Sequence, residues 1–360
     1  MHILHIVESF AAGCLTALSM LTQAVRGDIR HSVAHGMRAE TPENFAALFP
    51  PDVAFYRVPM AMGIADGLRA CQELSTLIRR TRPDVVHCHS SKAGVYGRLA
   101  AKTCGVPSVY TPHGYAFLRT DVLPPVRTLF KGIEWLASRA GDAIVACGTE
   151  EYALARQLAG PHHVVTCVPN ALDLPELACL PRPHLPFRNN TRVLVGTCGR
   201  AVAQRAPELF SSIACRLQDA ADWIWIGAER NAESLPHHVH GTGWVSRAYA
   251  LGTMAELDIY LQTSRWEGLS YSLLEAMALG KPVVATRIPA NEVVIDHGVT
   301  GLLGNGAEEL AEHVLRLASD PELRSRIGRA AQSCIADQYD ARRTYQEYAT
   351  LYHQLACTRR

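Results

Sequence analysis

The sequence predicts an α/β protein of two Rossmann-like domains, each a parallel sheet covered on both faces by helices. The chain has 360 residues, which exceeds what one hydrophobic core usually supports. Short runs rich in β-branched residues alternate with helical patterns along its length, which is typical of parallel sheets. A proline-rich stretch over 169–186 resists both helix and interior strand, so it divides this alternation into two series.

Each series supplies its own predicted strands. In the first half we expect strands over 3–7, 32–35, 53–58, 84–88, 108–111, 143–146 and 164–168. In the second half we expect strands over 192–197, 223–226, 259–262, 282–285 and 300–303. The predicted organisation is an N-terminal domain over 1–168, a linker over 169–191 and a C-terminal domain over 192–340. A last helix over 341–356 carries a tyrosine-rich stripe that needs a surface to cover.

Composition and charge exclude several classes of protein. The formal net charge of +1 argues against a nucleic-acid binder, because such proteins normally show a strongly basic face. The eleven cysteines are scattered without CxxC spacing, so we expect them to be reduced and buried. The first residues lack the features of a signal peptide, and no later apolar run is long enough to span a membrane. We therefore expect a cytoplasmic protein.

The most informative segment runs from Ser264 to Thr286 and reads as strand end, glycine turn, helix and strand. Glu267 precedes Gly268 at the entry to the helix, where unpaired backbone N–H groups and the helix dipole attract phosphate. Glu275 follows eight residues later, about two helical turns, and so points along the same face. The alternative is that both are ordinary surface glutamates, and the spacing alone leaves this open.

Two arginines follow the first strand of the second half. Arg200 comes directly after the strand, and Arg205 lies five residues further on. Guanidinium groups bind phosphate bidentately, so this pair would clamp the pyrophosphate of a nucleotide donor and neutralise its charge as it departs. The alternative is two solvated surface arginines.

The segment with both glutamates resembles the E-x7-E signature of the retaining glycosyltransferases of family 4, the group akin to glycogen and sucrose synthases. The residues after Glu275 and the downstream glycine turn at 296–301 extend the resemblance over most of 192–305. It implies the GT-B fold, in which two Rossmann-like domains face each other across a cleft and the C-terminal helix, 341–360, crosses back to the N-terminal domain. It also implies that Glu267 lies beside the transferred sugar and that Glu275 hydrogen-bonds the donor ribose.

Further donor contacts follow from the same resemblance. Gly268, Leu269 and Ser270 form the glycine turn that would meet the donor. The stretch from Gly199 to Arg205 resembles the family's G-R-x4-K element, with arginine where lysine is usual.

In the first half, Thr111-Pro112-His113-Gly114 resembles the family's T-x-H-G loop, whose histidine faces the donor sugar, so the resemblance nominates His113 as a catalytic residue. Gly13 lies in the first loop, where a backbone can approach a phosphate closely. The family usually has a glycine pair followed by an acidic residue there, and this chain reads Ala-Gly-Cys.

Two histidines, His87 and His89, alternate along a predicted strand and suggest a metal site. We reject that interpretation, because no carboxylate or CxxC partner lies at ligand spacing. Lys92 and Arg98, just beyond, either meet an acceptor phosphate or cap the helix. Neither a D-x-D motif nor a P-loop occurs, so we expect no metal and no cofactor.

The resemblance, together with these features, implies a metal-independent hexosyltransferase that moves a sugar, with retention, from a UDP- or GDP-sugar to a glycan or polyprenyl-linked acceptor. The expected setting is bacterial surface polysaccharide or lipopolysaccharide biosynthesis. The alternatives are a nucleotide-sugar epimerase or sugar phosphorylase on the same fold, or a non-catalytic sugar-binding protein.

A peripheral contact with the inner membrane face is a further expectation. Basic residues at 127, 131 and 139 alternate with Leu129, Phe130, Ile133, Trp135 and Leu136. The alternative is a helix packed into the core.

Overall fold

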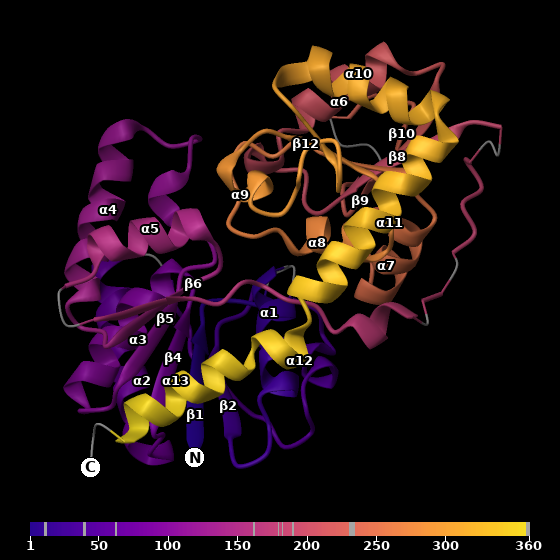
Figure 1. Ribbon diagram of the computed structural model, residues 1–360. Coiled ribbons are helices and arrows are strands. Elements are labelled where there is room, and N and C mark those ends of the chain that lie inside the picture. The colour runs from indigo at the N-terminus through magenta and orange to yellow at the C-terminus, as the bar shows by residue number, and fades with distance from the viewer. Residues whose placement is uncertain are drawn as a thin grey trace. The chain divides into compact units, whose positions relative to one another are not determined.

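The computed structural model divides the chain into two compact units, Met1–Ala171 together with the segment from Ala341 onward, and Leu172–Asp340. The units are coloured along the chain in Figure 1. The structure describes residues 1–10, 13–38, 41–61, 63–160, 163–178, 180–181, 183–188, 191–229 and 235–357. Among these residues, no helix is both long and apolar enough to cross a membrane.

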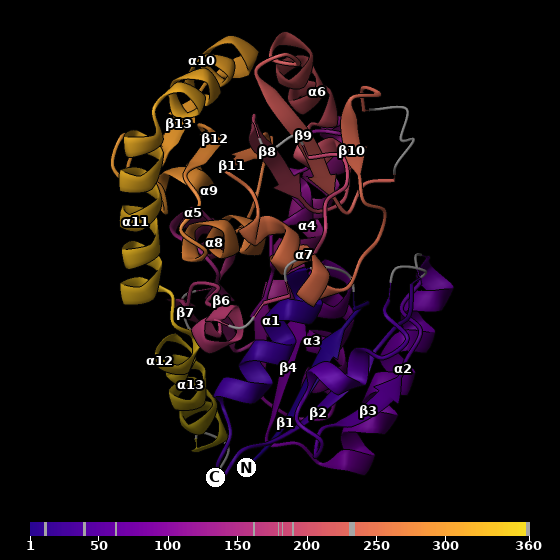
Figure 2. The ribbon, with the colours of Figure 1, turned by 90° about the vertical axis from the view of Figure 1, so that its right-hand side faces the viewer.

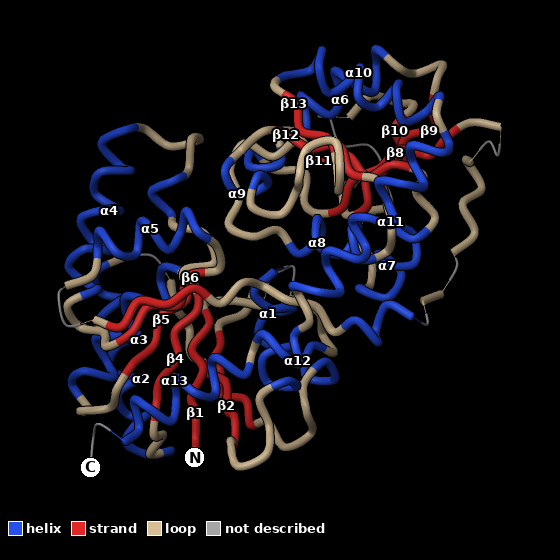
Figure 3. Tube along the Cα trace, in the orientation of Figure 1, coloured by secondary structure: helices blue, strands red, loops and turns tan. Residues whose placement is uncertain are grey.

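The first unit is built on a seven-stranded sheet in the order β3-β2-β1-β4-β5-β6-β7, drawn in red in Figure 3. All neighbouring strands are parallel. The strands are β1 (His2–Val7), β2 (Arg30–His35), β3 (Ala54–Arg57), β4 (Val85–His89), β5 (Ser108–Thr111), β6 (Ala143–Ala146) and β7 (Val164–Cys167). The strand order reverses between β1 and β4, and open parallel sheets bind ligands beyond the carboxyl ends of the strands at such a point.

Five helices connect these strands, with two short 3-10 turns at Phe45–Leu48 and Ala116–Leu118. The helices are α1 (Gly13–Ala24), α2 (Ile64–Thr81), α3 (Ser91–Thr103), α4 (Pro124–Ser138) and α5 (Thr149–Leu158). Helix α3 packs closely on the sheet because it has a glycine at Gly94, where a Cβ would lie 2.3 Å from the ring of Tyr110. The core of this unit lies between α2, α3 and the strands β1, β4 and β5.

The end of the chain belongs to the first unit, in agreement with the predicted return of the last helix. Helices α12 (Ala341–Thr344) and α13 (Gln346–Cys357) follow the second unit in sequence. The hydroxyl of Tyr352 in α13 lies 2.6 Å from Nδ1 of His87 in β4, and both side chains are fully buried. The tyrosine-rich stripe therefore covers the carboxyl half of the first sheet.

The second unit is built on a six-stranded parallel sheet in the order β10-β9-β8-β11-β12-β13. Its strands are β8 (Val193–Cys198), β9 (Ala221–Ile226), β10 (Val239–Gly241), β11 (Ile259–Gln262), β12 (Val283–Thr286) and β13 (Leu302–Gly304). The sequence did not predict β10, because three residues that include a histidine are too short to show a strand pattern. With two parallel Rossmann-like sheets, the predicted fold class is confirmed.

The helices of the second unit are α6 (Pro207–Arg216), α7 (Arg247–Ala255), α8 (Tyr271–Ala278), α9 (Pro289–Glu292), α10 (Gly306–Ser319) and α11 (Pro321–Gln338). Figure 2 shows α11 running beside α8, where the two helices pack against each other. This approach requires glycine at Gly328, because a Cβ there would lie 2.1 Å from the carbonyl oxygen of Gly280. Helix α11 begins sharply at Pro321, and the side chain of Asp320 caps it by accepting from the N–H of Leu323 at 2.9 Å.

Candidate active site

The loop between β11 and α8, together with α8 itself, holds the two glutamates of the predicted donor site. Glu267 lies in the loop and its side chain is 7% exposed. Glu275 lies in α8 and is 5% exposed. Neither is an ordinary surface residue, so the surface interpretation of this pair is wrong.

Three side chains hold the carboxylate of Glu267. Its Oε1 lies 3.3 Å from Nε of Arg205 and accepts from the hydroxyl of Ser264 at 2.9 Å. Its Oε2 accepts from the side-chain amide of Gln204 at 2.9 Å. Burial lowers the pKa of Arg205, but the carboxylate of Glu267 together with Tyr260 and Cys198 raises this pKa by more, so the net shift is upward. The guanidinium of Arg205 therefore stays charged beside Glu267.

Arg205 also contacts the amino-terminal end of α8. Its terminal nitrogens lie 3.0 Å from the hydroxyl oxygen of Ser272 and 3.4 Å from that of Ser270. Leu269 is buried, and Gly268 is half-buried beside it. The structure thus brings Arg205, Glu267 and the predicted glycine turn together at the end of β11.

Arg200 follows β8 at the same carboxyl edge of the sheet and is half-buried. The residue before it, Gly199, adopts a φ of +131°. A Cβ on Gly199 would lie 3.3 Å from Cζ of Arg205, so the backbone next to Arg200 packs against the second arginine of the predicted clamp. This conformation favours glycine at 199.

The sequence missed Arg247, which is the partner of Glu275. Its guanidinium lies 2.5 Å from Oε1 of Glu275, and two further nitrogens each lie 3.1 Å from a carboxylate oxygen of Glu176. Burial lowers the pKa of Arg247, but Glu275 and Glu176 raise it by more. Arg247 is 28 residues from Glu275 and carries no motif, so no local signal could have identified it.

In the first unit, His113 follows β5 and adopts a φ of +52°, which is unusual for a residue with a side chain. Its Nε2 lies 3.1 Å from Nδ1 of His89, and its Nδ1 lies 3.7 Å from Sγ of Cys147. Burial lowers the pKa of His113 to about 4, so the ring is neutral at pH 7. Both of its nitrogens face protein groups in this structure.

The loop around His113 is held by Glu151, which the sequence also missed. This buried carboxylate accepts from the backbone N–H of Gly114 at 2.7 Å and from that of Cys147 at 2.6 Å. It therefore ties the loop after β5 to the loop after β6. The two contacts are 37 and 4 residues away in sequence, and only the fold brings them together.

Lys92 and Gly13 lie at the carboxyl edge of the first sheet. The ammonium of Lys92 lies 2.6 Å from Oε1 of Glu8, and a guanidinium nitrogen of Arg38 lies at the same distance from that oxygen. Gly13 is exposed as the first residue of α1, and the neighbouring residues 11 and 12 are outside the described part of the chain. Their roles at an acceptor or a phosphate stay predictions.

The prediction that Arg98 contacts an acceptor is wrong, because its side chain is buried in the core and 1% exposed. One guanidinium nitrogen lies 2.8 Å from Oε2 of Glu134, and Nε donates to the carbonyl of Gly94 at 2.6 Å. The guanidinium also stacks 4.0 Å from the centre of the Tyr110 ring. Arg98 therefore joins α3, α4 and β5 and cannot reach a ligand at the surface.

Three buried histidines do come together in the first unit. The ring nitrogens of His5, His87 and His89 lie within 4.8 Å of one another. His5 and His89 bond to other histidines through both nitrogens, and His87 bonds to Tyr352 and Thr111. A metal ion would have to displace these hydrogen bonds, which already engage both nitrogens of each ring, so the cluster fits a hydrogen-bonded network better than a metal centre.

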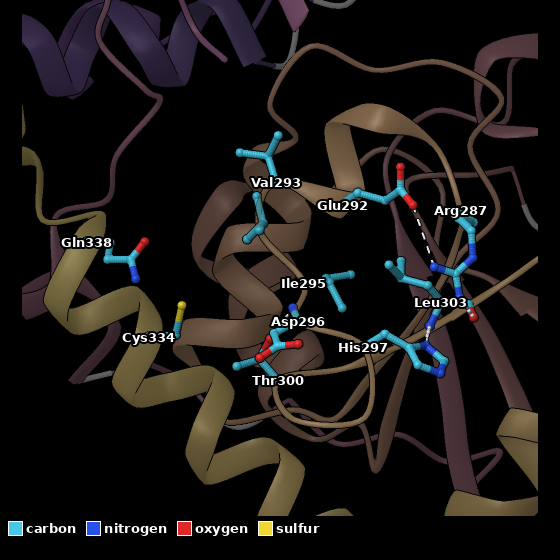
Figure 4. Close-up of a pocket in the computed structure, with 11 residues that line it drawn as sticks. Arg287, Glu292, Val293, Ile295, Asp296, His297, Thr300, Leu303, Cys334 and Gln338 are labelled. Carbon is cyan, nitrogen blue, oxygen red and sulfur yellow. Dashed lines mark hydrogen bonds and ion pairs between the residues drawn. The ribbon is translucent and has the colours of Figure 1, made fainter. Parts of the chain in front are cut away.

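A cavity of about 450 Å³ lies elsewhere in the second unit, beside the glycine turn that precedes β13. Figure 4 shows its lining, in which Arg287 pairs with Glu292 and Nδ1 of His297 accepts from the N–H of Leu303. None of the predicted donor residues lines it. The predicted site is therefore separate from this cavity.

Comparison with known proteins settles the class. A family model described as "Glycosyl transferase 4-like domain" matches residues 12–171, and one described as "Glycosyl transferases group 1" matches residues 227–333. The chain belongs to the family 4 glycosyltransferases. Both models describe glycosyl transfer, which favours a glycosyltransferase over the epimerase and phosphorylase alternatives.

Individual relatives agree with this assignment. The glycosyltransferase is 25% identical over 279 residues to the UDP-Gal:alpha-D-GlcNAc-diphosphoundecaprenol alpha-1,3-galactosyltransferase of Escherichia coli, covering 71% of this chain and 72% of that protein. Sucrose-phosphate synthase from Thermosynechococcus elongatus superposes with a TM-score of 0.83 at 16% identity, covering 99% and 100% of the two chains. HepE from Anabaena, solved in complex with UDP-glucose, gives a TM-score of 0.78 at 18% identity, covering 98% and 100%. The two structural likenesses confirm the GT-B fold.

Proposed function

We propose that this glycosyltransferase moves a hexose from a UDP-sugar, with retention of anomeric configuration, to a lipid-linked sugar acceptor of surface polysaccharide synthesis. The observation that carries the proposal is a pair of buried glutamates, Glu267 in the loop before α8 and Glu275 within α8, each held by its own arginine. The Escherichia coli relative uses UDP-Gal and a diphosphoundecaprenol acceptor, as its name states, and HepE binds UDP-glucose. These relatives support a UDP-sugar over a GDP-sugar.

The donor diphosphate would lie at the amino-terminal end of α8. Backbone N–H groups of that turn and the charged guanidinium of Arg205 supply positive charge there, and Arg200 stands at the neighbouring strand end. These groups stabilise negative charge as the diphosphate leaves, which is the work that a divalent cation performs in other enzymes. We therefore propose that transfer needs no metal, and that a chelator leaves the initial rate unchanged.

The two glutamates would have different tasks. Glu275 accepts hydrogen bonds from the vicinal hydroxyls of the ribose, and the ion pair with Arg247 holds its carboxylate in place. Glu267 lies beside the sugar, where positive charge develops at the anomeric carbon as the bond to the diphosphate breaks. In a transfer with retention, the acceptor hydroxyl attacks the face that the diphosphate leaves, and its proton passes to the departing diphosphate.

Binding of the nucleotide is the first test of this proposal. Thermal-shift titration with UDP, GDP and their common sugar conjugates should raise the melting temperature most with the true donor, because a ligand of the folded state stabilises it by mass action. No shift with any uridine nucleotide at millimolar concentration would contradict the proposed donor.

We further propose that helix α4 rests on an anionic membrane, where a polyprenyl-linked acceptor would be found. Four of its apolar side chains point outward: Leu129 is 60% exposed and Leu136 is 66% exposed, and Ile133 and Trp135 are also exposed. Phe130, by contrast, is half-buried and packs against the core. The buried side of the helix instead carries Glu134, Ala137 and Ser138.

In the usual amphipathic helix of a globular protein the apolar face is buried, whereas in α4 the apolar face is exposed. The buried ion pair between Glu134 and Arg98, together with the hydroxyl of Tyr110 that donates to Glu134 at 2.8 Å, anchors α4 to the sheet. The apolar face then needs no burial in the core, contrary to the core-packed alternative. Exposed Lys131 and Arg139 flank that face, and basic charge beside apolar side chains favours anionic lipid.

Cosedimentation with vesicles tests this contact. The Leu129→Ser and Leu136→Ser double variant should lose most binding to phosphatidylglycerol vesicles at low salt. Leu68→Ser is a matched control, since Leu68 is 63% exposed on α2, away from the patch. Equal binding of the double variant and the wild type, or no binding by the wild type, would contradict the membrane contact.

A further inference from the structure

A row of histidines connects the interior of the first sheet to the loop that carries His113. Nε2 of His31 in β2 bonds to the carbonyl of Val25, and Nδ1 of His31 lies 3.0 Å from Nε2 of His5 in β1. Nδ1 of His5 lies 3.1 Å from Nε2 of His89 in β4, and Nδ1 of His89 lies 3.1 Å from Nε2 of His113. Four rings from four successive positions across the sheet thus form one continuous relay.

The direction of every hydrogen bond in this relay follows from its first member. The carbonyl of Val25 can only accept, so Nε2 of His31 must carry a proton. A neutral imidazole has one N–H, so Nδ1 of His31 accepts and Nε2 of His5 donates to it. The same argument makes Nε2 of His89 donate to His5, and Nε2 of His113 donate to His89. All four rings are then Nε2–H tautomers.

The rings are neutral because of where they lie. His5 and His89 are almost completely buried, and burial with the neighbouring histidines lowers their pKa values well below the ordinary range. Burial also lowers the pKa values of His31 and His113. The adjacent His87 does not enter the relay, since its nitrogens bond to Tyr352 and Thr111.

The far end of the relay is consistent with the same direction. Nδ1 of His113 is left as an acceptor, and it faces Sγ of Cys147 at 3.7 Å. Burial raises the pKa of the Cys147 thiol well above its ordinary value, so the sulfur carries a proton that it can donate. With the thiol as the donor to His113, each polar atom in the chain of hydrogen bonds acts either as a donor or as an acceptor.

We propose that His31, His5 and His89 are positioning residues that fix His113 in the Nε2–H tautomer and hold its ring against the sheet. The side chain of His113 then cannot turn its N–H outward without breaking the relay. The importance of this tautomer for glycosyl transfer rests on the proposed function, in which the His113 loop lies beside the sugar. The tautomer itself does not depend on the proposed function.

The tautomer can be observed directly in the wild-type enzyme. Nitrogen-15 NMR of ring-labelled histidine at neutral pH distinguishes Nε2–H, Nδ1–H and charged rings, and single His→Gln substitutions assign the signals. The proposal requires His5, His31, His89 and His113 all to be neutral Nε2–H. An Nδ1–H or charged signal for any of the four would overturn it, whatever the activity.

Substitution at the start of the relay tests its effect on His113 from a distance. His31→Leu removes the acceptor for His5 and should give His113 a mixed tautomer signal, with kcat lowered about tenfold to a hundredfold and donor KM little changed. His31→Gln should restore both, because a side-chain amide can donate to Val25 and accept from His5. His2→Leu is the control, since His2 lies in the same sheet and bonds to Ser32 outside the relay.

The outcomes separate the two claims. If the wild-type tautomers are as stated and the His113 signal changes in His31→Leu while kcat does not, the relay stands and the proposed place of His113 beside the sugar fails. If the His113 signal in a folded His31→Leu enzyme is unchanged from the wild type, the relay does not set the tautomer and the proposal is wrong.

Discussion

Nε of Arg205 lies 3.3 Å from Oε1 of Glu267, and both side chains are largely buried. The first candidate catalytic carboxylate and the predicted phosphate-binding cation therefore form an ion pair with each other. Ser264 and Gln204 also hold Glu267, so the carboxylate keeps its position when a diphosphate competes for the guanidinium. The donor would meet a site whose charges are arranged in advance.

The clamp on the diphosphate predicts the effect of removing Arg200. Arg200→Ala should weaken UDP and the UDP-sugar alike, because each loses charge-assisted hydrogen bonds worth about 1.5 to 3 kcal/mol, or about 10- to 150-fold in affinity. Isothermal titration calorimetry measures both. Arg265→Ala is the matched control, because Arg265 is exposed and pairs with Glu208 instead. An Arg200→Ala enzyme that binds UDP as tightly as the control would show that Arg200 does not hold the diphosphate.

Glu275 should act mainly in binding. If its carboxylate accepts the ribose hydroxyls in the ground state and transition state alike, Glu275→Gln should raise donor KM about tenfold and leave kcat nearly unchanged. Steady-state kinetics with varied donor provide the measurement, and Glu312→Gln on the exposed side of α10 is the control. A large loss of kcat with unchanged KM would assign Glu275 to the chemical step.

Glu267 should act mainly in the chemical step. Its negative charge matters more as positive charge develops on the sugar, so Glu267→Gln should lower kcat about a hundredfold with a smaller change in KM. The neutral amide preserves the shape of the side chain, and a thermal melt checks that the variant is folded. A Glu267→Gln enzyme with the kcat of the wild type would remove Glu267 from the candidate catalytic residues.

The buried histidines predict how stability depends on pH. Burial lowers the pKa of His113 to about 4, against about 6.5 in an unfolded chain. Between these values the unfolded state binds more protons than the folded state, so the free energy of unfolding should fall as pH falls from about 6.5 towards about 4. Urea unfolding at several pH values measures this slope. His113→Gln should flatten it and exposed His353→Gln should not, and a slope of the opposite sign would show that the rings are protonated in the folded state.

The sequence predicts the fold well because both sheets are parallel and buried, and buried parallel strands appear as short apolar runs. Among the described strands, the three-residue β10 is the one that the sequence did not predict. In the second unit, the sequence also identified residues that the structure brings together. Arg205 and Glu267 belong to local motifs after the carboxyl ends of the adjacent strands β8 and β11, where the topology of the sheet gathers them.

The remaining features depend on partners far apart in the sequence. From the sequence, Arg98 is interpreted as a surface cation. The structure places it in the core beside Glu134, which lies 36 residues later in the sequence. Arg247 and Glu151 show no local pattern, and only the fold reveals what they hold. The relay needs histidines from β2, β1, β4 and the loop after β5. Of these four, the sequence singled out only His89, as one of an alternating pair, and His113, by resemblance to the family's loop.

The configuration of the product tests the central claim most directly. The enzyme is incubated with a UDP-hexose whose sugar is α-linked and with a short-chain GlcNAc diphospholipid, and proton NMR reads the anomeric coupling of the new glycoside. Where no acceptor is used, early spectra of slow transfer to water report the same stereochemistry before the free sugar equilibrates. We predict an α product and release of UDP. A β product would contradict transfer with retention, and absence of UDP release from every UDP-hexose would contradict the proposed donor.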